Sequence, residues 1–104
     1  MAVEVRDNPD EARYEIRADG ELAGFARYRL DDGQITFFHT EIHPEHEGVG
    51  LGGQLARGAL EDARARGLTV VPVCPFIADY IAHHPDEYLD MVVPEMRARL
   101  SGES

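Results

Sequence analysis

Four glycines lie close together near the middle of the chain, at Gly48, Gly50, Gly52 and Gly53. They follow residues 35–42, a run rich in aromatic and β-branched residues that is typical of a strand. They open directly into a pattern typical of an amphipathic helix. The first N–H groups of a helix have no intrahelical partner and carry partial positive charge, and glycine lets a ligand approach them closely. Residues 47–53 therefore predict a binding site for a phosphate-bearing ligand.

Two common phosphate-binding motifs fit these glycines poorly. A Walker A loop needs Lys followed by Ser or Thr after its last glycine, but Gln54 follows Gly53 and the chain contains no lysine. The spacing from Gly48 to Gly53 does match G-x-G-x-x-G, the fingerprint of dinucleotide-binding folds. Those folds also need an acidic residue about twenty positions further on. Residues 68–75 contain none, so nicotinamide binding is disfavoured.

Polar side chains alternate along the end of the predicted strand. His39, Glu41 and His43 are each two residues apart, so their side chains share one face of the strand. A carboxylate can serve as a general base where such a face lines a cleft. The same spacing, with His46 nearby, would also suit a zinc site built from His and carboxylate ligands. We assign a catalytic role to Glu41 and no metal site.

Three turn signals divide the first part of the chain into four short strands. The turns are Asn8-Pro9-Asp10, Asp19-Gly20 and Asp32-Gly33. The strands are expected around residues 3–5, 13–17, 22–30 and 34–42. Strands separated by such tight turns form an antiparallel meander.

A long helix is predicted at residues 50–66, because apolar residues recur four apart at Leu51, Leu55, Ala59 and Ala63. Gly67 stands where a glycine commonly ends a helix. Residues 68–73 are mostly apolar and predict a buried strand parallel to the fourth, reached by a right-handed crossover.

Prolines organise the last part of the chain. Pro75 and Pro94 are expected at the starts of two further helices, at residues 76–83 and 94–100, and Pro85 is expected to end the first of them. The predicted order of elements indicates an α+β fold, with a central helix on a mixed five-stranded sheet.

The length and composition of the chain disfavour several classes of function. The chain has 104 residues, which predicts one domain over residues 1–104, with a frayed tail at 101–104. Its formal net charge of −10 disfavours nucleic acid and anionic membranes as partners, because both require a basic surface. Cys74 is the only cysteine, so an internal disulfide is excluded. The sequence has no signal peptide or long apolar run, and we expect a cytoplasmic location.

Residues 47–52, Glu-Gly-Val-Gly-Leu-Gly, resemble the pyrophosphate loop of the GNAT superfamily of N-acetyltransferases, written Q/R-x-x-G-x-G/A. The tetrapeptide His39-Thr40-Glu41-Ile42 before the loop, and residues 71–76 after the predicted helix, are similar to the small, stand-alone GNAT-like subfamily. The resemblance extends over about residues 13–90 and implies a GNAT-like fold.

This resemblance implies that acetyl-CoA is the co-substrate. Backbone amides would hold its pyrophosphate, and they belong to Val49, Gly50, Leu51, Gly52 and Gly53. Ile42 would offer backbone groups to the pantetheine arm. Glu47 stands where the superfamily has Gln or Arg, so backbone amides must bind the anion beside a carboxylate.

The resemblance also gives Cys74 a role, either as an acyl-accepting nucleophile or as the acid that protonates the CoA thiolate. A buried apolar residue is the alternative interpretation. Glu41 would deprotonate the acceptor amine, which belongs to a small molecule or to a protein. A second hypothesis for the whole chain is a non-catalytic module that binds CoA or acyl-CoA.

Overall fold

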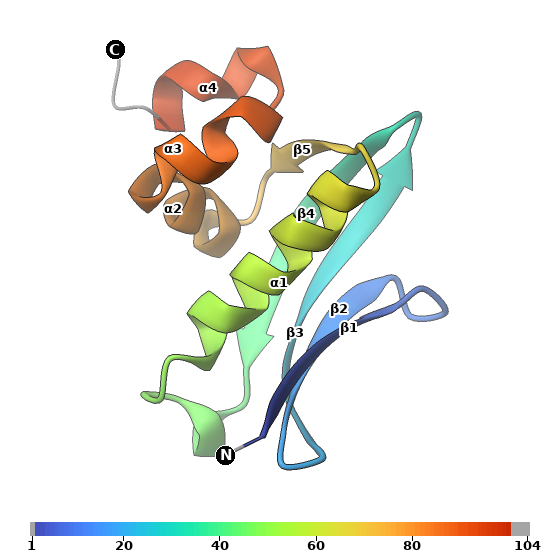
Figure 1. The fold of residues 1–104 in the computed structure, drawn as a ribbon, viewed down its shortest axis with the longest axis vertical. Helices are drawn as coiled ribbons and strands as arrows, with labels where there is room; N and C mark the ends of the chain where they lie inside the picture. The colour runs from blue at the N-terminus through green and yellow to red at the C-terminus, as the bar shows by residue number, and fades with distance from the viewer. Residues whose placement is uncertain (1, 101–104) are drawn as a thin grey trace.

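Five strands form one sheet in the order β1-β2-β3-β4-β5 (Figure 1). They are β1 (Val3–Asn8), β2 (Arg13–Ala18), β3 (Glu21–Asp31), β4 (Gln34–Ile42) and β5 (Thr69–Pro72). The first four strands pair antiparallel, and β5 pairs parallel to β4. This computed structural model describes residues 2–100, so the tail expected at 101–104 lies outside the described residues. The predicted α+β class, with a meander and a parallel fifth strand, is confirmed.

The two hairpin turns adopt the conformation that their sequences predict. Asp19 and Gly20 have φ values of 51° and 85°, and Asp32 and Gly33 have φ values of 47° and 78°. Two consecutive residues with positive φ match the turn whose twist fits a two-residue hairpin. Tight two-residue turns therefore join β2 to β3 and β3 to β4.

The central helix α1 (Leu51–Ala65) ends as expected. Gly67 has a φ of 69°, and its N–H donates to the carbonyl of Arg64 at 3.0 Å. The N–H of Leu68 donates to the carbonyl of Ala63 at 3.0 Å, so two of the last carbonyls of the helix are satisfied. The buried stripe of α1 consists of Leu51, Leu55, Ala56, Ala59, Leu60 and Ala63.

The C-terminal third contains one more helix than the sequence predicted. The expected helices are present as α2 (Pro75–His83) and α4 (Pro94–Leu100). Between them lies a short helix, α3 (Pro85–Tyr88), which begins at the proline that ends α2 because proline is tolerated at the first helical position. Two 3-10 turns complete the chain, η1 (Pro44–His46) and η2 (Leu89–Met91).

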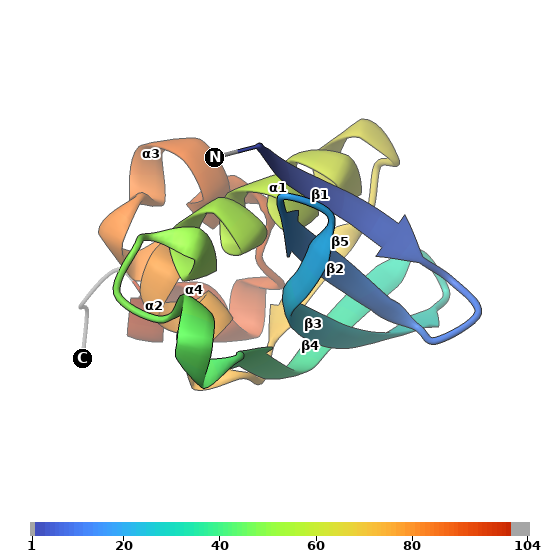
Figure 2. The same ribbon diagram turned by 90° about the horizontal axis from the view of Figure 1, so that it is seen from below.

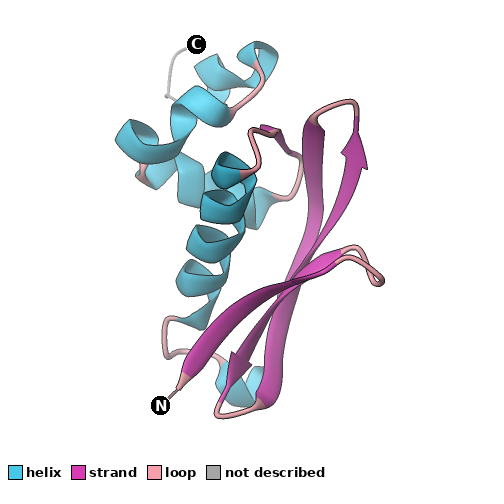
Figure 3. Cartoon of the chain, turned by 45° about the vertical axis from the view of Figure 1, so that its right-hand side comes forward, coloured by secondary structure: helices cyan, strands magenta, loops and turns pink. Residues whose placement is uncertain are grey.

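All of these helices except η1 lie on one side of the sheet, and no helix within residues 2–100 covers the other side (Figure 3). Seen from below, α1 lies within the curve of the twisted strands (Figure 2). No helix among the described residues is long and apolar enough to cross a membrane.

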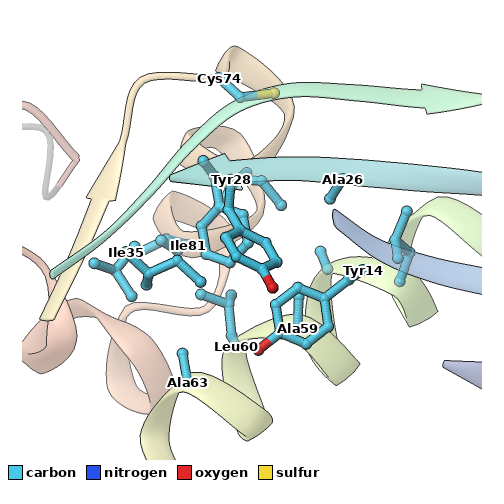
Figure 4. Close-up of a cluster of buried hydrophobic side chains, with 14 of the residues drawn as sticks. Tyr14, Ala26, Tyr28, Ile35, Ala59, Leu60, Ala63, Cys74 and Ile81 are labelled. Atoms are coloured by element: carbon cyan, nitrogen blue, oxygen red, sulfur yellow. The ribbon is translucent and has the colours of Figure 1, made fainter. Parts of the chain in front are cut away.

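Tyr14 and Tyr28 belong to the buried core (Figure 4). Their hydroxyl groups join this core to a polar network at its edge. The rings of Tyr14 and Tyr28 lie 5.3 Å apart between the sheet and α1. The Tyr14 hydroxyl donates to Asp62 at 2.5 Å, and the Tyr28 hydroxyl donates to Asp7 at 2.6 Å. Arg66 donates to both Asp7 and the Tyr14 oxygen at 3.3 Å. The network ties β1, β2 and β3 to the end of α1.

Burial and the hydrogen bond to Asp7 raise the pKa of Tyr28 to about 12, and burial and Asp62 raise the pKa of Tyr14 further. We expect the phenolate absorbance of the folded protein to show no titration near pH 10, where free tyrosine ionises. The unfolded chain then binds fewer protons than the folded one, so the free energy of unfolding should fall as pH rises from about 10 to 12. Urea unfolding at several pH values measures this slope, and Tyr28→Phe should reduce it. A slope of zero would contradict the assigned hydrogen bonds.

Close packing of β1 on α1 depends on a helix glycine. A Cβ added at Gly58 would lie 2.7 Å from a methyl carbon of Val5, whereas one added at Gly53 would lie 3.9 Å from Tyr80. Alanine favours a helix interior by about 1 kcal/mol over glycine, but overpacking costs about 1–3 kcal/mol. We therefore expect Gly58→Ala to destabilise the protein, measured by chemical denaturation, and Gly53→Ala to leave it unchanged or more stable. Equal gains from both substitutions would contradict the packing.

Candidate functional site

The site begins where β4 and β5 separate. Their ladder runs from Gln34 and Thr69 to Phe37 and Pro72, and β4 then continues to Ile42 without β5. The N–H of Cys74 donates to the carbonyl of Phe37 at 2.8 Å, and α2 begins at the next residue. The last residues of β4, 38–42, therefore have no ladder partner on the β5 side.

A β-bulge changes the direction of the side chains in this part of β4. In the pairing with β3, Phe37 lies opposite Tyr28 and His39 lies opposite Arg27, so Phe38 is the extra residue. The Phe38 side chain is 48% exposed. Beyond the bulge Thr40 shares the α1 face of the sheet with Phe37, and His39 and Glu41 lie on the opposite, outer face.

A pocket of about 240 Å³ lies at the N-terminus of α1. Its lining residues come from the end of β4, the loop before α1, the first turn of α1 and the start of α2: Ile42, His46, Glu47, Gly48, Gly50, Leu51, Gly52 and Phe76. Gly50 is the N-cap residue with a φ of 79°, and no side chain caps the helix. The first N–H groups of α1 thus have no side-chain acceptor, and the helix dipole favours negative charge at this end.

One wall of the pocket is the ring of Phe76. A Cβ added at Gly52 would lie 2.6 Å from the ring, so only glycine permits this contact without a shift of Phe76. Phe76 is 41% exposed and offers an apolar surface beside the polar amides. A ligand with an anionic centre and apolar arms on either side fits such a lining.

Cys74 lies at the separation of the strands, on the α1 face. It is 4% exposed and is the N-cap residue of α2. Its Sγ donates a hydrogen bond to Thr40 Oγ1 at 3.3 Å. Thr40 contacts the thiol proposed to be catalytic but was not predicted as a site residue, because no residue pattern indicates the bulge at Phe38.

Glu41 and His39 lie together on the outer face. His39 Nε2 is 3.3 Å from Glu41 Oε1, and each side chain is about half exposed, at 51% and 52%. His43 lies near the ring of Phe25, with ring centroids 6.5 Å apart. His46 lies apart from them, in the lining of the pocket. No group of three His, Cys, Asp or Glu side chains within residues 2–100 is arranged to hold a metal ion.

The pocket brings together four of the residues proposed to bind the cofactor, namely Ile42, Gly50, Leu51 and Gly52. Within the described chain, Val49 and Gly53 lie outside its lining, and Val49 is 55% exposed. His46 and Phe76 belong to the lining and were not predicted to bind the cofactor. Their side chains reach the pocket through the turn η1 and the start of α2, whose positions depend on tertiary packing.

Comparisons with known proteins agree with this geometry. A family model described as GCN5-related N-acetyl-transferase matches residues 13–91. Streptothricin acetyltransferase of Streptomyces lavendulae is 43% identical over 54 residues, which are 50% of this chain and 29% of that protein. The match thus spans less than a third of the relative's length.

A solved structure matches over nearly the whole fold. It is the solution structure of a GCN5-like protein from Staphylococcus aureus, with a TM-score of 0.62 and 26% sequence identity. The match covers 86% of this chain and 87% of that one. The family model covers well over half of the chain, and the fold matches as well. The chain therefore belongs to the family of GCN5-related N-acetyltransferases.

Proposed function

We propose that this protein binds acetyl-CoA where β4 and β5 separate and transfers the acetyl group to an amine. The observation that carries the proposal is the pocket at the N-terminus of α1, which adjoins the unpaired end of β4. The first amides of α1 would hold the pyrophosphate, with Val49 and Gly53 contributing from the flanks of the pocket. Backbone groups near Ile42 would bind the pantetheine arm, because β5 leaves them without a ladder partner.

The two proposed catalytic residues lie on different sides of β4, and this suits two different roles. Glu41 is on the outer face, where it would take the proton lost by the acceptor amine. Cys74 is on the inner side, where its buried thiol would protonate the departing sulfur of CoA. A nitrogen–carbon bond forms, the carbon–sulfur bond of the thioester breaks, and CoA leaves as the thiol. Thr40, through its hydrogen bond, would hold the Cys74 thiol in place.

Titration of the ¹⁵N-labelled protein with acetyl-CoA and with CoA tests the binding step. We expect the largest amide shifts at residues 48–53 and near Cys74, because the ligand would contact those backbone groups. Absence of shifts at saturating ligand would show that the pocket is structural only. A titration with inorganic phosphate shows how much of the effect comes from the anion site alone.

Turnover separates an enzyme from a non-catalytic CoA-binding module. We expect consumption of acetyl-CoA that depends on an added amine, and a loss of at least tenfold in kcat with Glu41→Gln, since general base catalysis contributes about 10²–10⁴-fold. Acetyl-CoA binding should survive that substitution. Mass spectrometry of the protein after incubation with acetyl-CoA alone tests the role of Cys74: we expect no acetylated Cys74, and its detection would identify a nucleophile rather than an acid.

Glu47 lines the pocket and would lie near the pyrophosphate as a like charge. We expect Glu47→Gln to tighten acetyl-CoA binding by about twofold to fivefold at low salt, the size typical of an exposed charge interaction. The gain should shrink as ionic strength rises. Glu45→Gln is the matched control, because Glu45 is exposed in η1 and outside the pocket lining. Calorimetry measures both, and unchanged or weaker binding in Glu47→Gln would contradict the pyrophosphate position.

A further inference from the structure

The outer face of the sheet concentrates the basic residues of an acidic chain. Five of the ten arginines lie at outward positions of β1, β2 and β3, and we call them the arginine face: Arg6, Arg13, Arg17, Arg27 and Arg29. No helix covers that side of the sheet (Figure 3). The same face also carries four acidic residues at outward strand positions, Glu4, Glu15, Asp31 and Glu41, whereas the chain as a whole has a net charge of −10. The face that carries Glu41 is thus much less acidic than the chain as a whole.

An aromatic ring orders the middle of the arginine face. Phe25 is 9% exposed, and the guanidinium carbons of Arg13 and Arg27 lie 4.7 Å and 5.1 Å from its ring centroid. Such stacking holds a planar guanidinium in place and leaves its N–H groups free to bind a carboxylate. The face is therefore partly organised before any partner binds.

Two of the five arginines keep their charge unpaired. Arg13 and Arg17 both pair with Glu15, at 2.8 Å and 3.4 Å, and Arg6 pairs with Glu4. Arg27 and Arg29 form no ion pair with any residue in the described part of the chain. Arg27 thus combines a stacked position with an available charge.

The sheet register places Arg27 beside the proposed base. Arg27 lies opposite His39, and Phe25 lies opposite Glu41. Diagonal neighbours in an antiparallel pair are about 7–8 Å apart, within reach of long side chains. An anionic group bound by Arg27 would therefore lie about two residue lengths of extended chain from Glu41.

We propose that the acceptor is a lysine side chain within an acidic segment of another protein. This proposal rests on the proposed function, because Glu41 must act on an amine held at the outer face. Acidic side chains flanking the lysine would pair with Arg27 and Arg29, and the lysine amine would lie at Glu41. Attack of the amine on the thioester then forms the amide and breaks the carbon–sulfur bond, Glu41 receives the amine proton, and CoA leaves as the thiol.

The chemistry of the face selects this acceptor over others. The arginines are spread over three strands, a width of about 10 Å at a strand spacing of about 4.8 Å, which exceeds one small amine. Nucleic acids carry no aliphatic amine to accept the acetyl group. A second copy of this chain supplies no lysine, because its basic residues are all arginines.

The net charge of the chain does not prevent such an encounter. Charges further apart than about 8 Å are largely screened at physiological ionic strength. An acidic segment at the outer face therefore responds chiefly to the arginines that it contacts. Elsewhere the acidic surface repels the segment, which favours the orientation with its lysine at Glu41.

The test uses three peptides of equal length in which one lysine is flanked by Glu, by Gln or by Arg. We expect the Glu-flanked peptide to have the lowest KM with an unchanged kcat, because flanking contacts bind without taking part in the reaction. Titration of the ¹⁵N-labelled protein with each peptide alone, without acetyl-CoA, should shift the amides of residues 25–29 and 39–41 most for the Glu-flanked peptide.

Substitution of Arg27 gives the decisive comparison. We expect Arg27→Gln to raise the KM of the Glu-flanked peptide by about fivefold, the upper size of an exposed ion pair, and to leave the Gln-flanked peptide unchanged. Arg27→Glu should reverse the preference in favour of the Arg-flanked peptide. Arg99→Gln in α4 is the control and should change none of these values, since Arg99 lies on the helical side of the molecule.

The outcomes separate this inference from the proposed function. Equal KM values for the three peptides, with acetyl transfer intact, would overturn the acidic acceptor and leave the acetyltransferase. A better rate with a small carboxylated amine than with any peptide would do the same. If acetyl-CoA does not bind, the proposed function is wrong. The peptide titration without acetyl-CoA then shows separately whether the arginine face binds acidic segments.

Discussion

The arrangement of the site depends on the point at which the parallel ladder between β4 and β5 ends. Pro72 has no N–H to donate, and Pro75 starts α2 three residues later, so β5 cannot follow β4 any further. The longer strand β4 is then left with unpaired backbone groups on one edge. Unpaired backbone groups must find another partner, either water or a ligand. This one constraint of strand length creates the unpaired edge at which we propose that the pantetheine arm binds.

A second constraint is that the proposed anion site would have to bind a negative group within a chain that is itself strongly acidic. With a net charge of −10 and Glu47 in the pocket lining, no basic side chain lines the pocket except His46. The site must depend on the unpaired N–H groups at the start of α1 and on the helix dipole. Glycine at the N-cap and in the first turn removes the side chains that would cover those groups. Local dipoles act within a few ångströms, where screening leaves them effective.

The sequence predicted the elements well because each depends on local chemistry. Neighbouring residues in the sequence determine the turns with positive φ, the four-residue spacing of apolar residues in α1 and the prolines at helix starts. The bulge at Phe38 was not predictable, because the sequence pattern of an aromatic-rich strand does not differ between a regular strand and one with an extra residue. The bulge nevertheless decides that Thr40 faces Cys74 and Glu41 faces outward. The short helix α3 was missed for a similar reason, since Pro85 can both end one helix and begin the next.

The bulge has a consequence for the proposed reaction. Because of the bulge, the thiol of Cys74 lies on one side of β4 and the carboxylate of Glu41 lies on the other. Acetyl transfer needs a base for the amine and an acid for the departing sulfur. In the proposed reaction the two groups would act on opposite sides of the thioester, because the strand lies between them. This proposal places the thioester carbon at the level of β4, where the acceptor would reach it from the arginine face and the cofactor from the helical side.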